Sequence, residues 1–289
     1  MVKMATAAQR ELRITGKGGL LSRSLTNVHA VTALRMASCF CFAVINMHSP
    51  ERQLLSKPTG ASFFSSCGAF EFYSNVTDTD FSLRGVVSGP METTRTSHGP
   101  ASQTDIILFQ AWAYVLKDAA RLTAFEWLVK LDVDTVALPC RLWPILQKHD
   151  ARRPLLFANG WDPISCSVGQ ASPCAVHGPM IVMSSSAGRL LARTLERFRV
   201  HIWNDEAKKD EYSDDLTLAT LATVAGCTIV PERGLLAEFF PGRSIPDCSS
   251  DHVAFHPMKT PMKHRQCLRH AMTQVGCPSA IAVVGTRLG

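Results

Sequence analysis

The amino-acid sequence predicts a domain of the α/β class, because strand-like and helix-like segments alternate along the chain. The apolar run at residues 39–45 has the length and composition of a buried strand. Residues 49–51, Ser-Pro-Glu, carry the cap, first-turn proline and early acid of a helix start. An apolar-aromatic segment at residues 69–73 completes a strand–helix–strand opening. With 289 residues, the chain is long enough to bury the core of such a domain.

The later elements follow in the same alternating manner. Residues 75–102 are rich in Asp, Thr, Ser, Gly and Pro and are expected to form a long loop. Helical periodicity covers residues 105–122, and a strand at 127–131 leads directly into Asp132-Val133-Asp134. Further strands are expected at residues 155–158, 175–183 and 228–230. Helices are expected to begin within residues 142–147, after a cap at 184–186, and after the segment 212–218.

The net charge of +6 is concentrated at one end of the chain. Residues 1–36 hold six basic residues and one acidic residue, which leaves about +1 for the remainder. We therefore expect no nucleic-acid partner. Three regions are predicted: a basic N-terminal extension at 1–37, either targeting or disordered, a single domain at 38–268, and a C-terminal helix and tail at 269–289.

Residues 28–47 are the segment most similar to a membrane anchor. His29, Arg35 and Asn46 interrupt it, and an arginine near the middle of a spanning helix costs roughly 2.5–3.5 kcal/mol. The uninterrupted apolar run at 39–45 is too short to cross a bilayer. A buried first strand is the favoured interpretation, and a degenerate signal or anchor, with membrane association, is the alternative.

The ten cysteines favour an oxidising compartment. Cys166 and Cys174 bracket one short polar loop, and Cys248 and Cys267 bracket another, as disulfide-bonded cysteines do. Asn75-Val76-Thr77 is a glycosylation sequon, typical of a glycoprotein. Together these features favour the lumen of the secretory pathway.

The acidic motif is the strongest chemical signal in the sequence. Asp132 and Asp134 follow a hydrophobic strand, and ligands of open α/β sheets bind beyond the carboxyl ends of the strands. Two carboxylates there can hold a divalent cation that bridges the phosphates of a nucleoside diphosphate and offsets the charge of a departing diphosphate. The alternative is that Asp134 merely caps the turn before Pro139.

Other residues could complete such a site. Asp214 and Asp215 stand at a loop-to-helix junction, where a carboxylate acts as a general base or simply caps the helix. His256, in the turn Ala-Phe-His-Pro, is either a further metal ligand or a packed histidine. Lys130 and Lys259 could reach phosphates, although solvated lysines are the default.

These motifs together resemble the GT-A-fold glycosyltransferases of the fringe and β-1,3-galactosyltransferase type. The matching segments, in the order found in that family, are residues 125–136, 177–184, 213–218 and 253–259, and the resemblance covers residues 38–268. It implies a GT-A (Rossmann-like) α/β fold with a mixed, mostly parallel sheet flanked by helices. It also implies residence in the Golgi or in another lumen of the secretory pathway.

The resemblance further implies a chemistry. The expected reaction is an inverting transfer of a sugar from a UDP-sugar to a hydroxyl of a glycan, glycoprotein or glycolipid acceptor. Manganese or another divalent ion is implied at Asp132 and Asp134, with His256 as a further ligand. Lys130, Asp132 and Lys259 are the expected nucleotide-binding residues, and Asp215, beside Asp214, is the expected base.

Two rival hypotheses stay open. The segment Leu131-Asp-Val-Asp-Thr-Val136 also fits the nucleophile motif of haloacid-dehalogenase-type phosphatases, in which Asp132 and Asp134 would act on phosphate esters. A catalytically inactive GT-A-like protein that only binds sugar or nucleotide is the other alternative.

Overall fold

The computed structural model of the protein describes residues 36–45, 54, 63–77, 83–85, 103–159, 176, 178–204, 214–238 and 248–275. Its centre is a seven-stranded sheet in the order β3-β2-β1-β4-β7-β6-β8. β7 runs antiparallel to both of its neighbours, and the other pairs are parallel. The seven strands are β1 (Cys39–Ile45), β2 (Ala69–Ser74), β3 (Leu83–Gly85), β4 (Trp127–Asp132), β6 (Leu155–Ala158), β7 (Met180–Ser184) and β8 (Thr228–Pro231).

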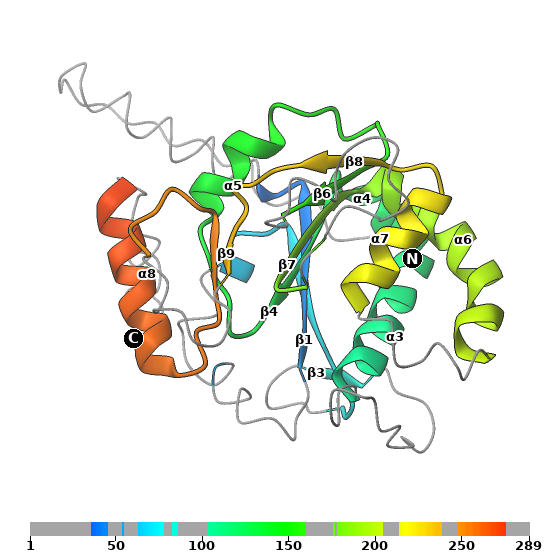
Figure 1. The fold of residues 1–289 in the computed structure, drawn as a ribbon, viewed down its shortest axis with the longest axis horizontal. Coiled ribbons are helices and arrows are strands. Elements are labelled where there is room, and N and C mark those ends of the chain that lie inside the picture. The colour runs from blue at the N-terminus through cyan, green and yellow to red at the C-terminus, as the bar shows by residue number, and fades with distance from the viewer. Residues whose placement is uncertain are drawn as a thin grey trace, which may run out of the picture.

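Helices cover both faces of this sheet, so the expected α/β fold with a mixed, mostly parallel sheet flanked by helices is confirmed. The helices are α3 (Gln103–Lys117), α4 (Ala119–Ala124), α5 (Pro139–Leu146), α6 (Ser185–Asn204), α7 (Asp214–Val224) and α8 (Pro261–Val275). Figure 1 shows α3, α6 and α7 together on one side of the sheet and α8 on the other.

The central strands separate two hydrophobic cores, because successive side chains point to opposite faces of a strand. On β1, Phe40 and Phe42 face the core formed with α3, α4, α6 and α7, whereas Cys41 and Ala43 face the core formed with α5. β4 follows the same alternation, with Trp127, Val129 and Leu131 on the α5 side. Burial on both faces explains why these strands are almost continuously apolar.

A second, three-stranded sheet lies beside the main one. Its order is β5-β10-β9, with β5 (Val136–Ala137), β9 (Leu236–Glu238) and β10 (Ala254–His256). β10 is antiparallel to β5 and parallel to β9. A third hydrophobic cluster, which includes Val136, Phe255 and Ala271, packs this small sheet against α8.

The favoured interpretation of residues 39–45 is confirmed. β1 is fully buried and pairs with β2 on one side and β4 on the other. No helix among the described residues is long and apolar enough to cross a membrane. Residues 1–35 of the predicted extension lie outside the described part of the chain, and Met36 belongs to the core on the α5 side of the sheet.

Several element boundaries differ from the sequence-based expectations. The helix predicted at 105–122 is two helices, because the side chain of Asp118 accepts a hydrogen bond from the Arg121 backbone and caps a new helix, α4. β7 begins at Met180 and not at residue 175. The final helix begins at Pro261, earlier than the expected boundary at residue 269. β8 lies at an edge of the sheet.

Candidate metal and nucleotide site

The acidic motif stands at the carboxyl end of β4, in the middle of the main sheet. Asp132 is the last residue of β4, and the chain turns immediately, with the Thr135 backbone donating a hydrogen bond to the Asp132 carbonyl at 3.0 Å. Asp134 lies within this turn and is buried. The short strand β5 follows and joins the small sheet. The turn therefore connects the two sheets, and the small sheet brings its own residues to the same place.

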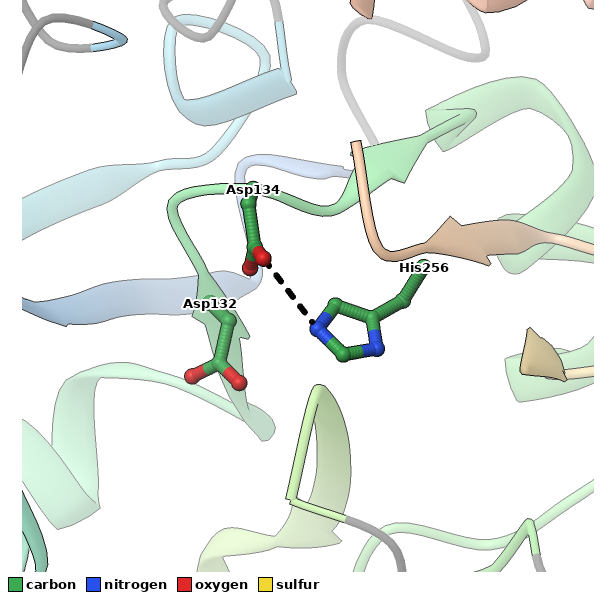
Figure 2. Close-up of side chains that lie close together, drawn as sticks. All are labelled: Asp132, Asp134 and His256. Atoms are coloured by element: carbon green, nitrogen blue, oxygen red, sulfur yellow. Dashed lines mark ion pairs between the residues drawn. The ribbon is translucent and has the colours of Figure 1, made fainter. Parts of the chain in front are cut away.

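His256 is the residue of the small sheet that lies beside Asp134. It ends β10, and its Nε2 lies 3.3 Å from Asp134 Oδ2. The backbone N–H of Met258 donates a hydrogen bond of 2.7 Å to the Asp134 carbonyl, which fixes the two segments against each other. Figure 2 shows the Asp134 carboxylate and the His256 ring facing one another, with Asp132 on the strand that leads into the turn of Asp134.

Asp134 is held as a carboxylate. Burial alone would raise its pKa, but hydrogen bonding and charge from His256, together with Lys259, lower the pKa from 3.8 to about 2. The Nζ of Lys259 lies 2.8 Å from Asp134 Oδ2. Asp134 therefore stays negatively charged across the physiological pH range.

Asp132 is paired with a lysine of its own strand. Lys130 and Asp132 are two residues apart and so lie on the same face of β4. Lys130 Nζ is 2.6 Å from Asp132 Oδ1 and 2.5 Å from the carbonyl of Gly178. The Lys130 side chain is only 1% exposed, so the expectation of a solvated lysine is wrong. An ammonium buried to this extent needs charged and hydrogen-bonding partners, which Asp132 and Gly178 provide.

Asp132, Asp134 and His256 together form a group that could hold a metal ion. Each offers one ligand atom, and these atoms all lie within 4.8 Å of one another. Two carboxylates and one imidazole suit a divalent cation such as manganese or magnesium, which prefers oxygen ligands and accepts a histidine nitrogen in the manganese case. The donor set and its charge therefore fit a divalent ion.

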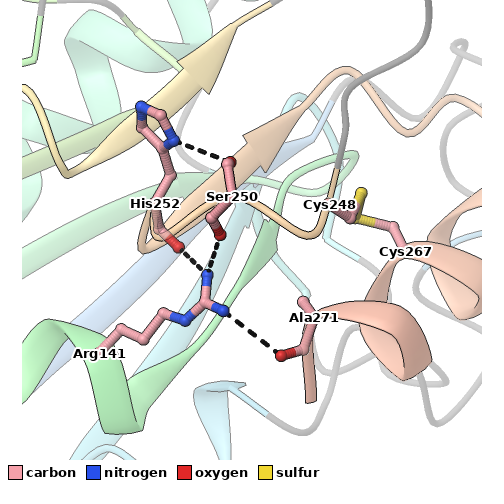
Figure 3. The surroundings of a disulfide bond; sticks show 6 residues. All are labelled: Arg141, Cys248, Ser250, His252, Cys267 and Ala271. Atoms are coloured by element: carbon pink, nitrogen blue, oxygen red, sulfur yellow. Dashed lines mark hydrogen bonds between the residues drawn. A yellow bond between two sulfur atoms is a disulfide. The ribbon is translucent and has the colours of Figure 1, made fainter. Parts of the chain in front are cut away.

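The segment that carries His256 is anchored from two sides (Figure 3). The disulfide Cys248–Cys267 joins its start to α8. The buried guanidinium of Arg141, on α5, donates hydrogen bonds of 2.6 Å to the carbonyls of both Ser250 and His252. Arg141 also reaches the carbonyl of Ala271 on α8 at 3.4 Å. One side chain thus ties α5, the segment before β10, and α8 together.

The disulfide predictions have different outcomes. Cys248 and Cys267 are bonded, as their spacing predicts, whereas Cys166 and Cys174 lie outside the described residues. A second disulfide, Cys41–Cys67, links β1 to the segment before β2 and has no local sequence signature. Disulfides are typical of proteins that fold in an oxidising compartment.

For the predicted base, the structure describes only the position of the backbone. Asp214 and Asp215 are the first residues of α7, so the loop-to-helix junction is where the sequence predicts it. Their side chains lie outside the described part of the structure. The choice between general base and helix cap therefore stays a prediction.

The metal-binding candidates were predicted from the sequence, whereas the residues that position them were not. Arg141 carries no signal in the sequence, because its role depends on carbonyl groups from two distant segments. The same holds for the carbonyl of Pro179, which accepts a hydrogen bond of 3.0 Å from the Asp132 backbone. Lys130 could have been recognised as buried, because it sits inside a strand that is otherwise apolar up to Asp132.

Comparison with known proteins identifies no family for this chain. No family model and no curated protein matches the chain. Among solved structures, it is similar to a glycosyltransferase involved in the glycosylation of the major capsid of PBCV-1. That similarity has a TM-score of 0.44 and 12% sequence identity, and it covers 81% of this chain and 99% of the other. A similarity this low establishes no family membership, so function has to be inferred from the residues of this chain.

Proposed function

We propose that this protein is a divalent-metal-dependent glycosyltransferase that uses a UDP-sugar as donor. The observation that carries the proposal is the convergence of Asp132, Asp134 and His256 at the carboxyl end of a central strand. An α/β sheet binds nucleotides at that edge. The order of the motifs, which resembles fringe and β-1,3-galactosyltransferase sequences, supports the same class.

The role proposed for each residue of the site follows from its charge and position. Asp134 and His256 would hold the metal ion directly, and Asp132 would complete its coordination, directly or through water. The bound ion would offset the negative charge that builds on the diphosphate as the sugar leaves. Lys259, which is 57% exposed, would reach a phosphate, whereas the buried Lys130 would orient Asp132.

Transfer with inversion needs one base that takes a proton from the acceptor hydroxyl as it attacks the sugar. We assign this role to Asp215, at the start of α7, with Asp214 beside it. The acceptor would be a glycan, glycoprotein or glycolipid, and the disulfides are consistent with action in the Golgi lumen.

The phosphatase alternative is less consistent with the charge state of the site. A phosphatase of the Asp-x-Asp kind needs a carboxylic acid that can give a proton to the leaving group. The pKa of Asp134, about 2, leaves it almost fully ionised at neutral pH. His256 would also have to release it.

The decisive experiment is a donor screen. Purified protein is incubated with a panel of UDP-sugars, with and without manganese, and UDP release is measured together with Mn²⁺ binding by calorimetry. The proposal expects metal-dependent UDP release that Asp134→Ala abolishes. Cleavage of phosphate esters with magnesium, and no binding of UDP, would favour the phosphatase. Binding of UDP without turnover of any donor would favour the inactive binding protein.

A further inference from the structure

Each carboxylate of the site is already paired with a lysine, and the two lysines differ in mobility. Lys130 Nζ lies 2.6 Å from Asp132 Oδ1, and Lys259 Nζ lies 2.8 Å from Asp134 Oδ2. The Lys130 side chain is 1% exposed and comes from the middle of β4, so the surrounding packing restricts its movement. The Lys259 side chain is 57% exposed, and its flexible four-carbon stem can swing into solvent.

Lys259 also uses the same oxygen that faces His256. Asp134 Oδ2 is 3.3 Å from His256 Nε2 and 2.8 Å from Lys259 Nζ. A metal ion shared by Asp134 and His256 would lie on this side of the carboxylate. Two cations at one oxygen repel each other strongly in a partly buried site. Metal binding and the Lys259–Asp134 ion pair are therefore in competition.

We propose that Lys259 is an exchangeable stand-in for the metal ion. Without metal, its ammonium neutralises the buried Asp134; with metal, it leaves Asp134 and turns to the diphosphate of the nucleotide. The inference rests on the proposed function and adds a coupling between the two ligands. Since each carboxylate already has a lysine, a divalent ion leaves the site with two extra positive charges. A nucleoside diphosphate supplies the matching negative charge.

The exchange makes the binding of metal and nucleotide cooperative. A nucleotide that engages Lys259 removes the competitor of the metal ion, and by linkage the metal strengthens nucleotide binding by the same factor. Metal–phosphate contact also contributes to cooperativity, so the share due to Lys259 has to be measured by difference. A variant without the ammonium should bind the metal alone more tightly and gain less from the nucleotide.

The test is a calorimetric titration of Mn²⁺, with and without saturating UDP, on the full chain. The variants are Lys259→Met and, as a matched control, Lys148→Met. Lys148 is an exposed lysine after α5 that makes no ion pair within the described residues. We expect Lys259→Met to bind Mn²⁺ alone about fivefold more tightly or better, the lower end of typical couplings. The gain in Mn²⁺ affinity on adding UDP should shrink by a similar factor, and Lys148→Met should match the wild type.

The outcomes separate this inference from the proposed function. Wild-type protein that binds Mn²⁺, combined with a Lys259→Met variant of equal or weaker affinity for Mn²⁺ alone, would overturn the stand-in role and leave the proposed function untouched. Absence of Mn²⁺ binding in both proteins would overturn both. Tight Mn²⁺ binding only in Lys259→Met would support the exchange, because it shows that the lysine blocks the site. Lys259→Gln provides a second neutral variant if Lys259→Met does not fold.

Discussion

Lys130 Nζ lies 2.6 Å from Asp132 Oδ1, and both residues belong to the central strand β4. The first aspartate of the acidic motif is therefore paired with a buried cation of its own strand. The two residues contribute differently to the pair. Lys130 is almost completely buried, whereas the side chain of Asp132 is 34% exposed. The loss of either partner should therefore have unequal effects on stability.

Removal of the carboxylate should destabilise the protein more than removal of the lysine. Asp132→Ala leaves a buried ammonium with weaker compensation and should lower the free energy of unfolding by about 1–3 kcal/mol. Lys130→Met replaces the ammonium with an apolar side chain of similar length and should change it by less than about 1 kcal/mol. Urea unfolding of both variants and of the double variant measures the coupling.

The double variant Lys130→Met/Asp132→Ala should be more stable than Asp132→Ala alone, because it contains no unpaired buried charge. Asp150→Ala is the control, since it breaks an exposed ion pair with Arg152 and should leave stability unchanged. If Lys130→Met proves the more destabilising single change, the ammonium contributes packing or hydrogen bonds that outweigh its burial.

The Cys248–Cys267 disulfide should matter for metal binding although neither cysteine is a ligand. It closes a short loop at the start of the segment that carries His256. Replacing both cysteines with serine should cost about 3 kcal/mol of stability from the loop-closure entropy. Because His256 would then be less firmly positioned, Mn²⁺ affinity should also fall by about tenfold, as for other residues that support ligands.

The other disulfide gives a matched control for this prediction. Cys41 and Cys67 enclose a loop of comparable length, with a sequence separation of 26 against 19. Their double replacement with serine should cost similar stability and leave Mn²⁺ affinity within about twofold of the wild type. Equal loss of Mn²⁺ affinity in both variants would show that general destabilisation, and not the position of His256, is responsible.

The free energy of unfolding should decrease as the pH is lowered from neutral to mildly acidic, because of a buried histidine on α8. Burial lowers the pKa of His264 by more than the Thr135 backbone and Asp134 raise it. The unfolded chain therefore binds a proton, below about pH 6.5, that the folded chain does not accept. The contribution of the neutral His264 to stability is fully present above that pH. It is lost as the pH falls toward the lower folded pKa, by at most about 1.4 kcal/mol per pH unit.

His264→Gln should flatten this dependence, since glutamine does not titrate. The free energy of unfolding, measured at pH 7 and pH 5.5, should differ less in the variant than in the wild type. His252, whose pKa is lowered mainly by burial and also by Arg141, should leave part of the slope in place. An identical slope in the variant and the wild type would contradict a burial effect at His264.

Asp215→Asn should separate catalysis from binding. If Asp215 is the base, the variant should lose sugar transfer by about a hundredfold or more while UDP and Mn²⁺ affinities stay unchanged. Single-turnover transfer, measured beside calorimetry, checks both at once. Asp214→Asn is the neighbouring control and should keep most of the activity. Loss of UDP binding in Asp215→Asn would instead indicate a helix-capping role.

Local patterns in the sequence determined a large part of this protein. The buried strand at 39–45, the strand before Asp132, the junction at Asp214 and the Cys248–Cys267 pair were all predicted, because each depends on neighbours in the chain. The break at Asp118 was missed because its capping side chain competes with an otherwise continuous helical period.

Only the tertiary structure decided how the site is built. His256 and Lys259 meet Asp134 because a small sheet folds back onto the turn after β4, and no spacing in the sequence specifies that contact. Burial of Lys130, and its pairing with Asp132 and Gly178, depends on β1 and β7 enclosing β4. The hydrogen bonds of Arg141 join segments far apart in the chain. Periodicity predicts elements, whereas long-range packing determines which charges face each other.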